Sequence, residues 1–130
     1  MIDHVSIAVS DLVRSAAFYE SVLAPLGYVK LVVRERTIGF GKSHAELWIN
    51  LRDNLGKPPA AVGAHVAFRA RDEQAVMQFH AAALAQGGAD DGAPGPRPYG
   101  AGPNIYYAAF VIDPDGNKIE AVTFLPPGRA

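Results

Sequence analysis

The sequence contains no cysteine, which excludes disulfide bonds, thiolate metal ligands and a cysteine nucleophile. Any bound metal must therefore be held by His, Asp or Glu side chains. An excess of one charge is also lacking, because 12 basic and 13 acidic residues give a formal net charge of −1. This balance offers no basic footprint for nucleic acid and no polybasic patch for an anionic membrane. Small molecules or proteins are the expected partners.

Long apolar runs are missing as well. No run approaches the ~20 residues that a membrane-spanning helix needs, and no charged segment followed by an apolar core opens the sequence. The chain has 130 residues, of which 49% are hydrophobic, and this is enough for one compact domain. We therefore expect a soluble, cytoplasmic protein with a single domain over residues 1–130.

An internal repeat with an offset of 61 residues divides the chain. IDHVSIAVSD at 2–11 aligns with GAHVAFRARD at 63–72, so that His4 corresponds to His65. Helical spacing of apolar residues predicts helices over 12–26 and 72–86 at the same offset, and strands are expected at 28–35, 37–42 and 45–51. The pattern predicts a first module at 1–53, a turn-rich linker at 54–63 and a second module at 64–125.

The second module ends in two predicted strands, YYAAFVID and NKIEAVTF, joined by a tight turn, DPDG at 113–116. Aligning KIEAVTF with AELWINL of the first module makes Glu120 correspond to Glu46, so the second module is 13 residues longer. The excess falls in a segment rich in glycine and proline at 90–104. We interpret it as a long surface loop, in which Arg97 and Tyr99 would form part of a lid.

Alternation along the predicted strands separates two faces of each sheet. Val5, Ile7 and Val9 lie on the face expected to pack against a helix, as do the corresponding apolar residues of the other strands. The opposite faces would form a polar, partly aromatic lining for a cleft, made of His4, Ser6, Ala8, Glu46, Trp48, Asn50, His65, Ala67, Arg69, Lys118, Glu120 and Val122.

Two histidines and two glutamates in this lining, His4, Glu46, His65 and Glu120, can bind a divalent metal ion. Imidazole and carboxylate ligands suit Zn, Ni, Co, Mn or Fe and do not choose among them. A cation would also offset the cost of burying the two carboxylates. His44 is an alternative ligand to Glu46. For substrate binding, Trp48, Asn50, Arg69 and Tyr107 are candidates, with Arg69 facing a substrate carboxylate. Tyr106 is a further candidate to line the cavity, and core packing is an alternative role for each aromatic residue.

Three segments resemble the vicinal oxygen chelate superfamily, which contains glyoxalase I, fosfomycin-modifying enzymes, bleomycin-resistance proteins and extradiol dioxygenases. They are DHVSIAVSDLVRSAAFYESVLAPLG at 3–27, HVAFRA at 65–70 and FVIDPDGNKIEAV at 110–122. The resemblance implies an α+β fold in which two paired βαβββ modules form an open, barrel-like cleft. It implies metal ligands at His4, His65 and Glu120, and a fourth at Glu46 as in glyoxalase I. It also implies a homodimer, because clefts in this family are often completed across two chains.

The function that this resemblance implies is a metal-dependent lyase or isomerase of the glyoxalase I type. Glu120 would be the base that moves a proton, with Glu46 sharing the role. No residue set identifies a glutathione site, so the substrate stays open. Two alternatives remain: a binding protein of the bleomycin-resistance kind, which sequesters a small ligand without turnover, and a ferrous dioxygenase that uses His4, His65 and Glu120 while Glu46 is idle.

Overall fold

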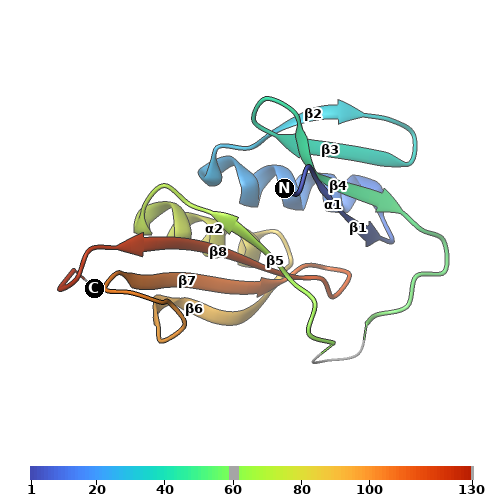
Figure 1. Cartoon of the computed structure of the whole chain (residues 1–130). Helices are drawn as coiled ribbons and strands as arrows, with labels where there is room; N and C mark the ends of the chain where they lie inside the picture. The colour runs from blue at the N-terminus through green and yellow to red at the C-terminus, as the bar shows by residue number, and fades with distance from the viewer. Residues whose placement is uncertain (59–61, 130) are drawn as a thin grey trace.

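Two modules with the same order of elements make up the computed structural model, which describes residues 1–58 and 62–129 (Figure 1). The first module contains β1 (Val5–Val9), α1 (Leu12–Leu23), a short 3-10 helix η1 (Ala24–Leu26), β2 (Val29–Val33), β3 (Thr37–Gly41) and β4 (Ala45–Leu51). The second contains β5 (Val66–Arg69), α2 (Glu73–Ala85), β6 (Ala89–Arg97), β7 (Ile105–Ile112) and β8 (Lys118–Leu125). The linker prediction at 54–63 includes residues 59–61, which lie outside the described residues.

Each helix is capped by the aspartate that precedes it, and these two aspartates occupy equivalent positions in the repeat. The Asp11 carboxylate accepts a hydrogen bond from the backbone N–H of Arg14 at 3.0 Å, and Asp72 accepts one from Ala75 at 2.9 Å. Each bond satisfies a backbone donor that the first helical turn leaves free, which is the role of an N-cap. The α1 segment ends through η1 at Gly27, whose φ of 85° is one that glycine adopts without strain.

Each module folds into a four-stranded mixed sheet, in the order β1-β4-β3-β2 in the first and β5-β8-β7-β6 in the second. The first strand pairs in parallel with the last (β1 with β4, β5 with β8), and the remaining pairs are antiparallel. This repeated topology confirms the predicted α+β fold of two βαβββ modules. It places the first and last strands, which carry the predicted metal ligands, side by side.

The prediction of a surface loop over 90–104 is wrong for its first half, because residues 89–97 form β6. This strand lies at the edge of its sheet and pairs only with β7, with two register shifts between Asp90 and Gly95. An edge strand tolerates Pro94 and Pro96 because one side of its backbone needs no partner. Arg97 consequently belongs to a strand and not to a lid.

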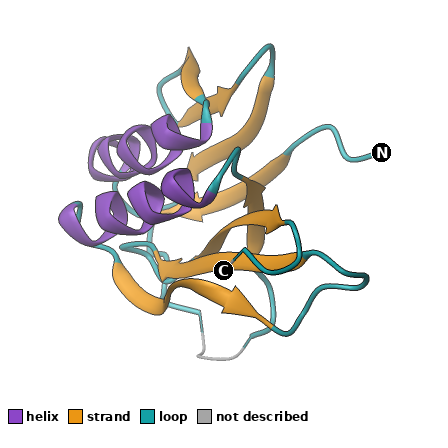
Figure 2. Ribbon diagram, turned by 90° about the vertical axis from the view of Figure 1, so that its left-hand side faces the viewer, coloured by secondary structure: helices purple, strands orange, loops and turns teal. Residues whose placement is uncertain are grey.

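The larger of two apolar clusters among the described residues joins the two modules. It contains residues of α1 and α2, the helix-facing residues of the central strands such as Leu47, Ile49 and Ile119, and Phe68 of β5. The two helices lie side by side on one flank of the molecule and the strands lie on the other, as Figure 2 shows. Each sheet therefore has one face against this core, as the alternation predicts, and an opposite, open face, which on the second sheet carries the smaller cluster of Ala108, Phe110 and Val122.

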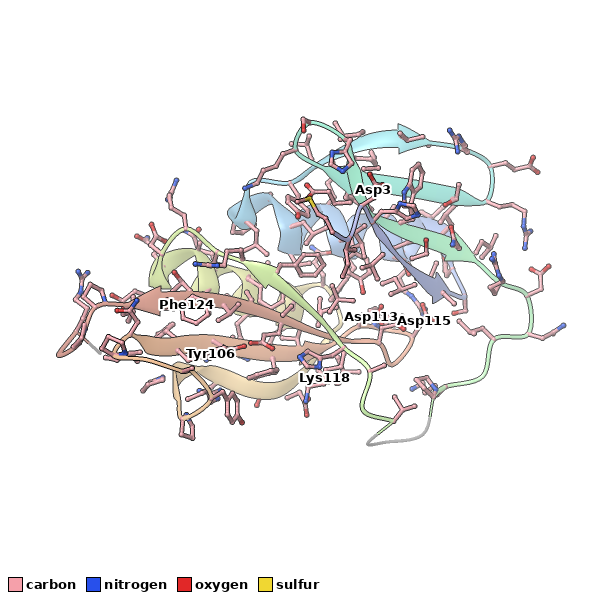
Figure 3. The ribbon with its side chains drawn as sticks, in the orientation of Figure 1. Asp3, Tyr106, Asp113, Asp115, Lys118 and Phe124 are labelled. Atoms are coloured by element: carbon pink, nitrogen blue, oxygen red, sulfur yellow. The ribbon has the colours of Figure 1, made fainter. Side chains whose placement is uncertain are left out.

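Polar contacts also join the modules, where the turn between β7 and β8 meets the first module. The Tyr19 hydroxyl donates to Asp113 Oδ2 at 2.6 Å, and Asn117 Nδ2 donates to the backbone oxygen of Ala8 at 2.9 Å. The Ser10 hydroxyl donates to Asp115. Asp113 and Asp115 are both buried at this junction (Figure 3). These bonds fix the position of the turn that precedes β8.

Candidate functional site

The open face of the second sheet carries a buried carboxylate that makes two polar contacts. Glu120 of β8 is 2% exposed, and its Oε1 lies 3.0 Å from His65 Nε2. Its Oε2 accepts a hydrogen bond from the Tyr106 hydroxyl of β7. The register explains the grouping: Glu120 pairs with Phe110 on β7 and with Ala67 on β5, so Tyr106 and His65 project from neighbouring strands.

The charge of Glu120 acts on Tyr106. Burial of the phenol, together with the hydrogen bond to the Glu120 carboxylate and its negative charge, raises the pKa of Tyr106 to about 12. Tyr106 is therefore a neutral hydrogen-bond donor at physiological pH. Its ring makes edge-on contacts with Tyr99 at 5.7 Å and with Phe124 at 5.3 Å, measured between ring centroids.

A cavity of about 360 Å³ opens beside this group. It is lined by side chains of β6, β7 and β8 and by the residue before β5, including His65, Gly92, Arg97, Tyr106, Phe110 and Glu120. A second cavity of about 680 Å³ borders His65 and Lys118 on the side of the linker residues Lys57 and Pro58, but Glu120 does not line it. The smaller cavity therefore holds the carboxylate and the phenol together.

On the first sheet, His4 lies beside an aspartate and a second histidine. His4 Nδ1 is 2.7 Å from Asp3 Oδ1, and His44 Nε2 is 3.3 Å from the backbone oxygen of Asp3. The hydrogen bond from His4 lowers the pKa of Asp3 below its ordinary value. Metal-bound histidines characteristically donate their second ring nitrogen to a carboxylate. The pairing of His4 with Asp3 leaves Nε2 as the nitrogen available to a ligand.

Asp3, His4 and His44, which we call the His4 group, border an open cavity on the first sheet. His4, His44, Ala45, Trp48 and Arg34 line it, and the Arg34 guanidinium carbon lies 5.5 Å from the Trp48 ring centroid. Glu46 does not line this cavity. Glu46 lies near Tyr28 instead. Burial of the Tyr28 phenol, together with the negative charge of the nearby Glu46 carboxylate, raises the pKa of Tyr28.

The strand register places Trp48, and not Glu46, at the position equivalent to Glu120. On the second sheet Ala67 pairs with Glu120; on the first sheet the equivalent residue, Ser6, pairs with Trp48. A register shift between β3 and β4 lies beside this position, where Gly41 pairs with Ala45 although Phe40 pairs with Leu47. The sequence alignment of Glu46 with Glu120 therefore differs from the structural correspondence by two residues.

The remaining predicted substrate-binding residues are dispersed. The Arg69 guanidinium carbon lies 4.6 Å from the Phe124 ring centroid on the second sheet. Asn50 accepts a hydrogen bond from the Thr37 hydroxyl on the first sheet. Tyr107 is 8% exposed and packs in the main core, so its neighbour Tyr106 is the tyrosine that faces the cavity. The difference between Tyr106 and Tyr107 follows from strand alternation, because adjacent residues of a strand face opposite ways and only one of the two can share the face of Glu120.

Imidazole and carboxylate groups are ligand types that divalent transition metals accept, and His65 Nε2 lies 3.0 Å from Glu120 Oε1, the distance of a direct hydrogen bond. Over residues 1–58 and 62–129, however, no three His, Asp or Glu side chains of one chain come together as a metal-binding group. The His65–Glu120 pair and the His4 group lie on different sheets, as the labelled Asp3 and Tyr106 indicate in Figure 3.

Comparisons with known proteins agree on one family. The sequence profile of the Glyoxalase/Bleomycin resistance protein/Dioxygenase superfamily matches residues 1–121. No curated protein sequence matches the chain. Among the described helices, none combines the length and the apolar character that crossing a bilayer requires.

Solved structures of this superfamily superpose on nearly the whole chain. A glyoxalase/bleomycin resistance protein from Albidiferax ferrireducens is 31% identical with a TM-score of 0.80, over 92% of this chain and 96% of that one. A glyoxalase I mutant from Zea mays is 26% identical with a TM-score of 0.70, over 92% of this chain and 44% of that one. The fosfomycin resistance protein FosX from Listeria monocytogenes, 20% identical over 94% of this chain and 91% of its own with a TM-score of 0.66, shares the fold.

Proposed function

This chain belongs to the glyoxalase/bleomycin resistance protein/dioxygenase superfamily, and on that premise we propose that it is a metal-dependent enzyme for a proton-transfer isomerisation or lyase step. The observation that carries the proposal is the buried Glu120 carboxylate, which contacts His65 Nε2 on one oxygen and the Tyr106 hydroxyl on the other. Such a carboxylate is costly to bury unless a cation or hydrogen bonds compensate its charge. The substrate is a small oxygenated molecule.

The metal site is proposed to form between two copies of the chain. His65 and Glu120 of one copy and His4 of the other would hold a divalent ion, with Glu46 as a predicted fourth ligand. This division is consistent with the placement of the His4 and His65–Glu120 groups on separate sheets, each with an open face. Apolar side chains on β2, Val29, Leu31 and Val33, are also exposed on the first module and would be covered by a second copy.

In the reaction, Glu120 is the base. Its carboxylate takes a proton from the carbon next to a substrate carbonyl, and the electron pair moves toward the carbonyl oxygen. The substrate would carry a hydroxyl group on the carbon that loses the proton. The hydroxyl proton moves to the former carbonyl oxygen and Glu120 returns its proton to the former carbonyl carbon, so the carbonyl group changes place and the isomerisation balances. Tyr106 contacts Oε2 and His65 contacts Oε1, so these two contacts fix the orientation of the carboxylate. A bound divalent ion supplies electrophilic stabilisation of the negative charge that develops on the substrate oxygens.

A second candidate, a ferrous dioxygenase with two histidines and one carboxylate, is supported by the register on the first sheet. Trp48 occupies the position equivalent to Glu120, so the ligand set would contain His4, His65 and Glu120 only. Glu46 would then not bind the metal and would remain beside Tyr28. The two candidates differ in the role of Glu46, which makes this residue the decisive one to replace.

Metal titration tests both candidates. Protein purified without chelator is analysed for bound metals, and metal-free protein is titrated with Zn²⁺, Ni²⁺ and Fe²⁺ by calorimetry. We expect Glu120→Gln to weaken the binding by at least about tenfold, whereas Glu35→Gln, at an exposed glutamate, is the matched control. Unchanged affinity in Glu46→Gln would remove Glu46 from the ligand set.

Activity assays then separate the reaction classes. Turnover of methylglyoxal thiol adducts supports the isomerase, and ring cleavage of catechols with uptake of oxygen supports the dioxygenase. No bound metal after purification, and none after titration, would contradict both and favour a binding protein that sequesters a small ligand without turnover.

A further inference from the structure

The cavity beside Glu120 contains an arginine that is held in place by the backbone. Arg97, at the end of β6, pairs with Tyr106 in the strand register, so its side chain lies on the same open face. Its Nη2 donates to the backbone oxygen of Ala93 at 2.6 Å, and its Nη1 donates to the backbone oxygen of Pro96 at 3.2 Å. These bonds use two of the five guanidinium donors, and the others remain for a ligand.

The surroundings of Arg97 are shaped to accommodate a flat guanidinium. Its central carbon lies 5.6 Å from the Phe110 ring centroid. A Cβ at Gly92 would come within 3.1 Å of Nη2 and 3.0 Å of the Phe110 ring, and one at Gly95 would lie 3.3 Å from Nη1. Gly92 also has a φ of 154°, which side chains rarely adopt. The glycines of β6 thus give the guanidinium its place over the aromatic ring.

The charge of Arg97 is not balanced by a direct partner. Lys118, the other cation of this cavity, forms an ion pair with Asp91 at 3.1 Å. In the part of the chain that the structure describes, no carboxylate comes within ion-pair distance of the Arg97 guanidinium. A guanidinium held by neutral carbonyls at the wall of a cavity is suited to bind a planar anion through a pair of parallel hydrogen bonds.

We infer that Arg97 binds a carboxylate group of the substrate in the cavity beside Glu120, with a planar or aromatic part of that substrate against Tyr106 and Tyr99. The inference deepens the proposed function, on which its catalytic meaning rests, because it assigns the substrate to the small unsaturated or aromatic carboxylates. The carboxylate anchor lies on β6 and the base on β8, so a substrate held at one end presents its other end to Glu120. Arg97 is thus a specificity-determining residue of the second module alone.

Binding of benzoate to metal-free protein tests the inference. Chelator-treated protein labelled with ¹⁵N is titrated with benzoate, and with benzamide as the neutral ligand of the same shape, while backbone amide shifts are followed by NMR. We expect saturable shifts at Gly92 and Gly95 with benzoate, and an affinity for benzamide that is weaker by about tenfold. Arg97→Met keeps an unbranched stem over Phe110 without the charge and should weaken benzoate binding by about tenfold or more.

Two further variants keep the test decisive. Arg71→Met removes an arginine of the same module that is 87% exposed and paired with Asp72 outside the cavity, and it should leave benzoate binding unchanged. Arg97→Lys keeps the positive charge but lacks the planar pair of N–H donors, so we expect its affinity for benzoate to lie between those of the wild-type protein and Arg97→Met. The unfolding temperature of each variant is measured first, and Arg97→Lys replaces Arg97→Met in the comparison if the latter does not fold.

The inference is overturned if benzoate gives no saturable shift at about 50 mM, or if Arg97→Met binds it as the wild-type protein does. It is also overturned if benzamide binds equally well. Because no metal is present in these titrations, benzoate binding that depends on Arg97 supports the inference even if metal titration disproves the proposed function. Metal binding without benzoate binding would leave the proposed function standing and remove this inference.

Discussion

Replacing Tyr19 by phenylalanine tests how the two modules are held together. Tyr19 of α1 is fully buried, and its hydroxyl donates to Asp113 Oδ2 at 2.6 Å across the junction between the modules. Asp113 Oδ2 also accepts from Asn117 Nδ2 at 2.9 Å, and Oδ1 accepts from the backbone N–H groups of Asp115 and Asn117. Tyr19→Phe thus removes one of four hydrogen bonds to a buried carboxylate and creates only a very small void.

The magnitude follows from the charge of the acceptor. A hydrogen bond to a charged group contributes about 1.5–3 kcal/mol to stability, so we expect Tyr19→Phe to lower the free energy of unfolding by about 2 kcal/mol at pH 8. For a domain of this size that corresponds to a fall of roughly 8 °C in the unfolding temperature.

The penalty should become smaller at alkaline pH. Burial, followed by the charge of and the hydrogen bond to Asp113, raises the pKa of Tyr19 well above 10. The unfolded tyrosine ionises near pH 10 while the folded one keeps its proton, so its contribution to stability is complete below pH 10 and declines above it. At about pH 11 the wild-type protein loses roughly 1.4 kcal/mol through this residue, a loss that Tyr19→Phe cannot show. The difference between the two proteins therefore shrinks from about 2 to about 0.6 kcal/mol.

Urea unfolding at pH 8 and pH 11, followed by circular dichroism, measures these quantities. Tyr99→Phe is the matched control, because Tyr99 is 64% exposed, and it should change stability little at either pH. Other tyrosines cancel in the comparison since they are common to both proteins. A Tyr19→Phe penalty below that of the control, or one that does not diminish at pH 11, would refute this account of the junction.

Three more predictions concern the candidate site. Tyr106→Phe leaves Glu120 Oε2 without its donor, and calorimetry should show metal affinity weakened by about tenfold, less than in Glu120→Gln; an effect as large as that of Glu120→Gln would make Tyr106 more than a positioning residue. Gly92→Ala should lower the free energy of unfolding in urea by about 1–2 kcal/mol and weaken benzoate binding, and unchanged values would contradict the tight packing of Arg97. Sedimentation equilibrium should give twice the chain mass of 13.8 kDa, and a metal affinity that stays constant when the dimer dissociates would show that one chain holds the ion alone.

The helices, and which side chains of each strand point toward the core, were predictable because both depend on short-range patterns. Aspartate caps, 3.6-residue periodicity and alternation are all written in neighbouring residues, and the structure follows them at Asp11 and Asp72 and in the core positions of β1 and β4. The internal repeat extended these local signals to a topology. It is the reason that the arrangement of two similar sheets was predictable from a single sequence.

The β6 strand was not predictable from composition, because Gly92, Pro94 and Pro96 are typical of loops. What makes a strand of this segment is its position at a sheet edge, where a proline needs no second partner and where bulges absorb the irregular backbone. That position depends on the pairing with β7, which no local pattern of β6 encodes. The misassignment also concealed the place of Arg97 beside Tyr106.

Strand register limited the prediction of the site in a similar way. Counting residues between His and Glu in the two modules made Glu46 and Glu120 equivalent, but the spacing between two strands says nothing about how they slide against each other. The pairing of Ser6 with Trp48 depends on the loop after β3 and on the bulge at Gly41. A repeat in sequence thus predicts which strands are adjacent without fixing which side chains are opposite.

The register has a consequence for how the two modules share one function. If Trp48 stands where Glu120 stands on the other sheet, the duplicated sheets are no longer chemically equivalent. The second carries the proposed base Glu120, its phenol donor Tyr106 and the cation Arg97, which line one cavity. In the proposed mechanism the first would contribute the imidazole of His4 and an aromatic surface. A substrate would then be bound in one orientation only, which a pair of equivalent half-sites would not enforce.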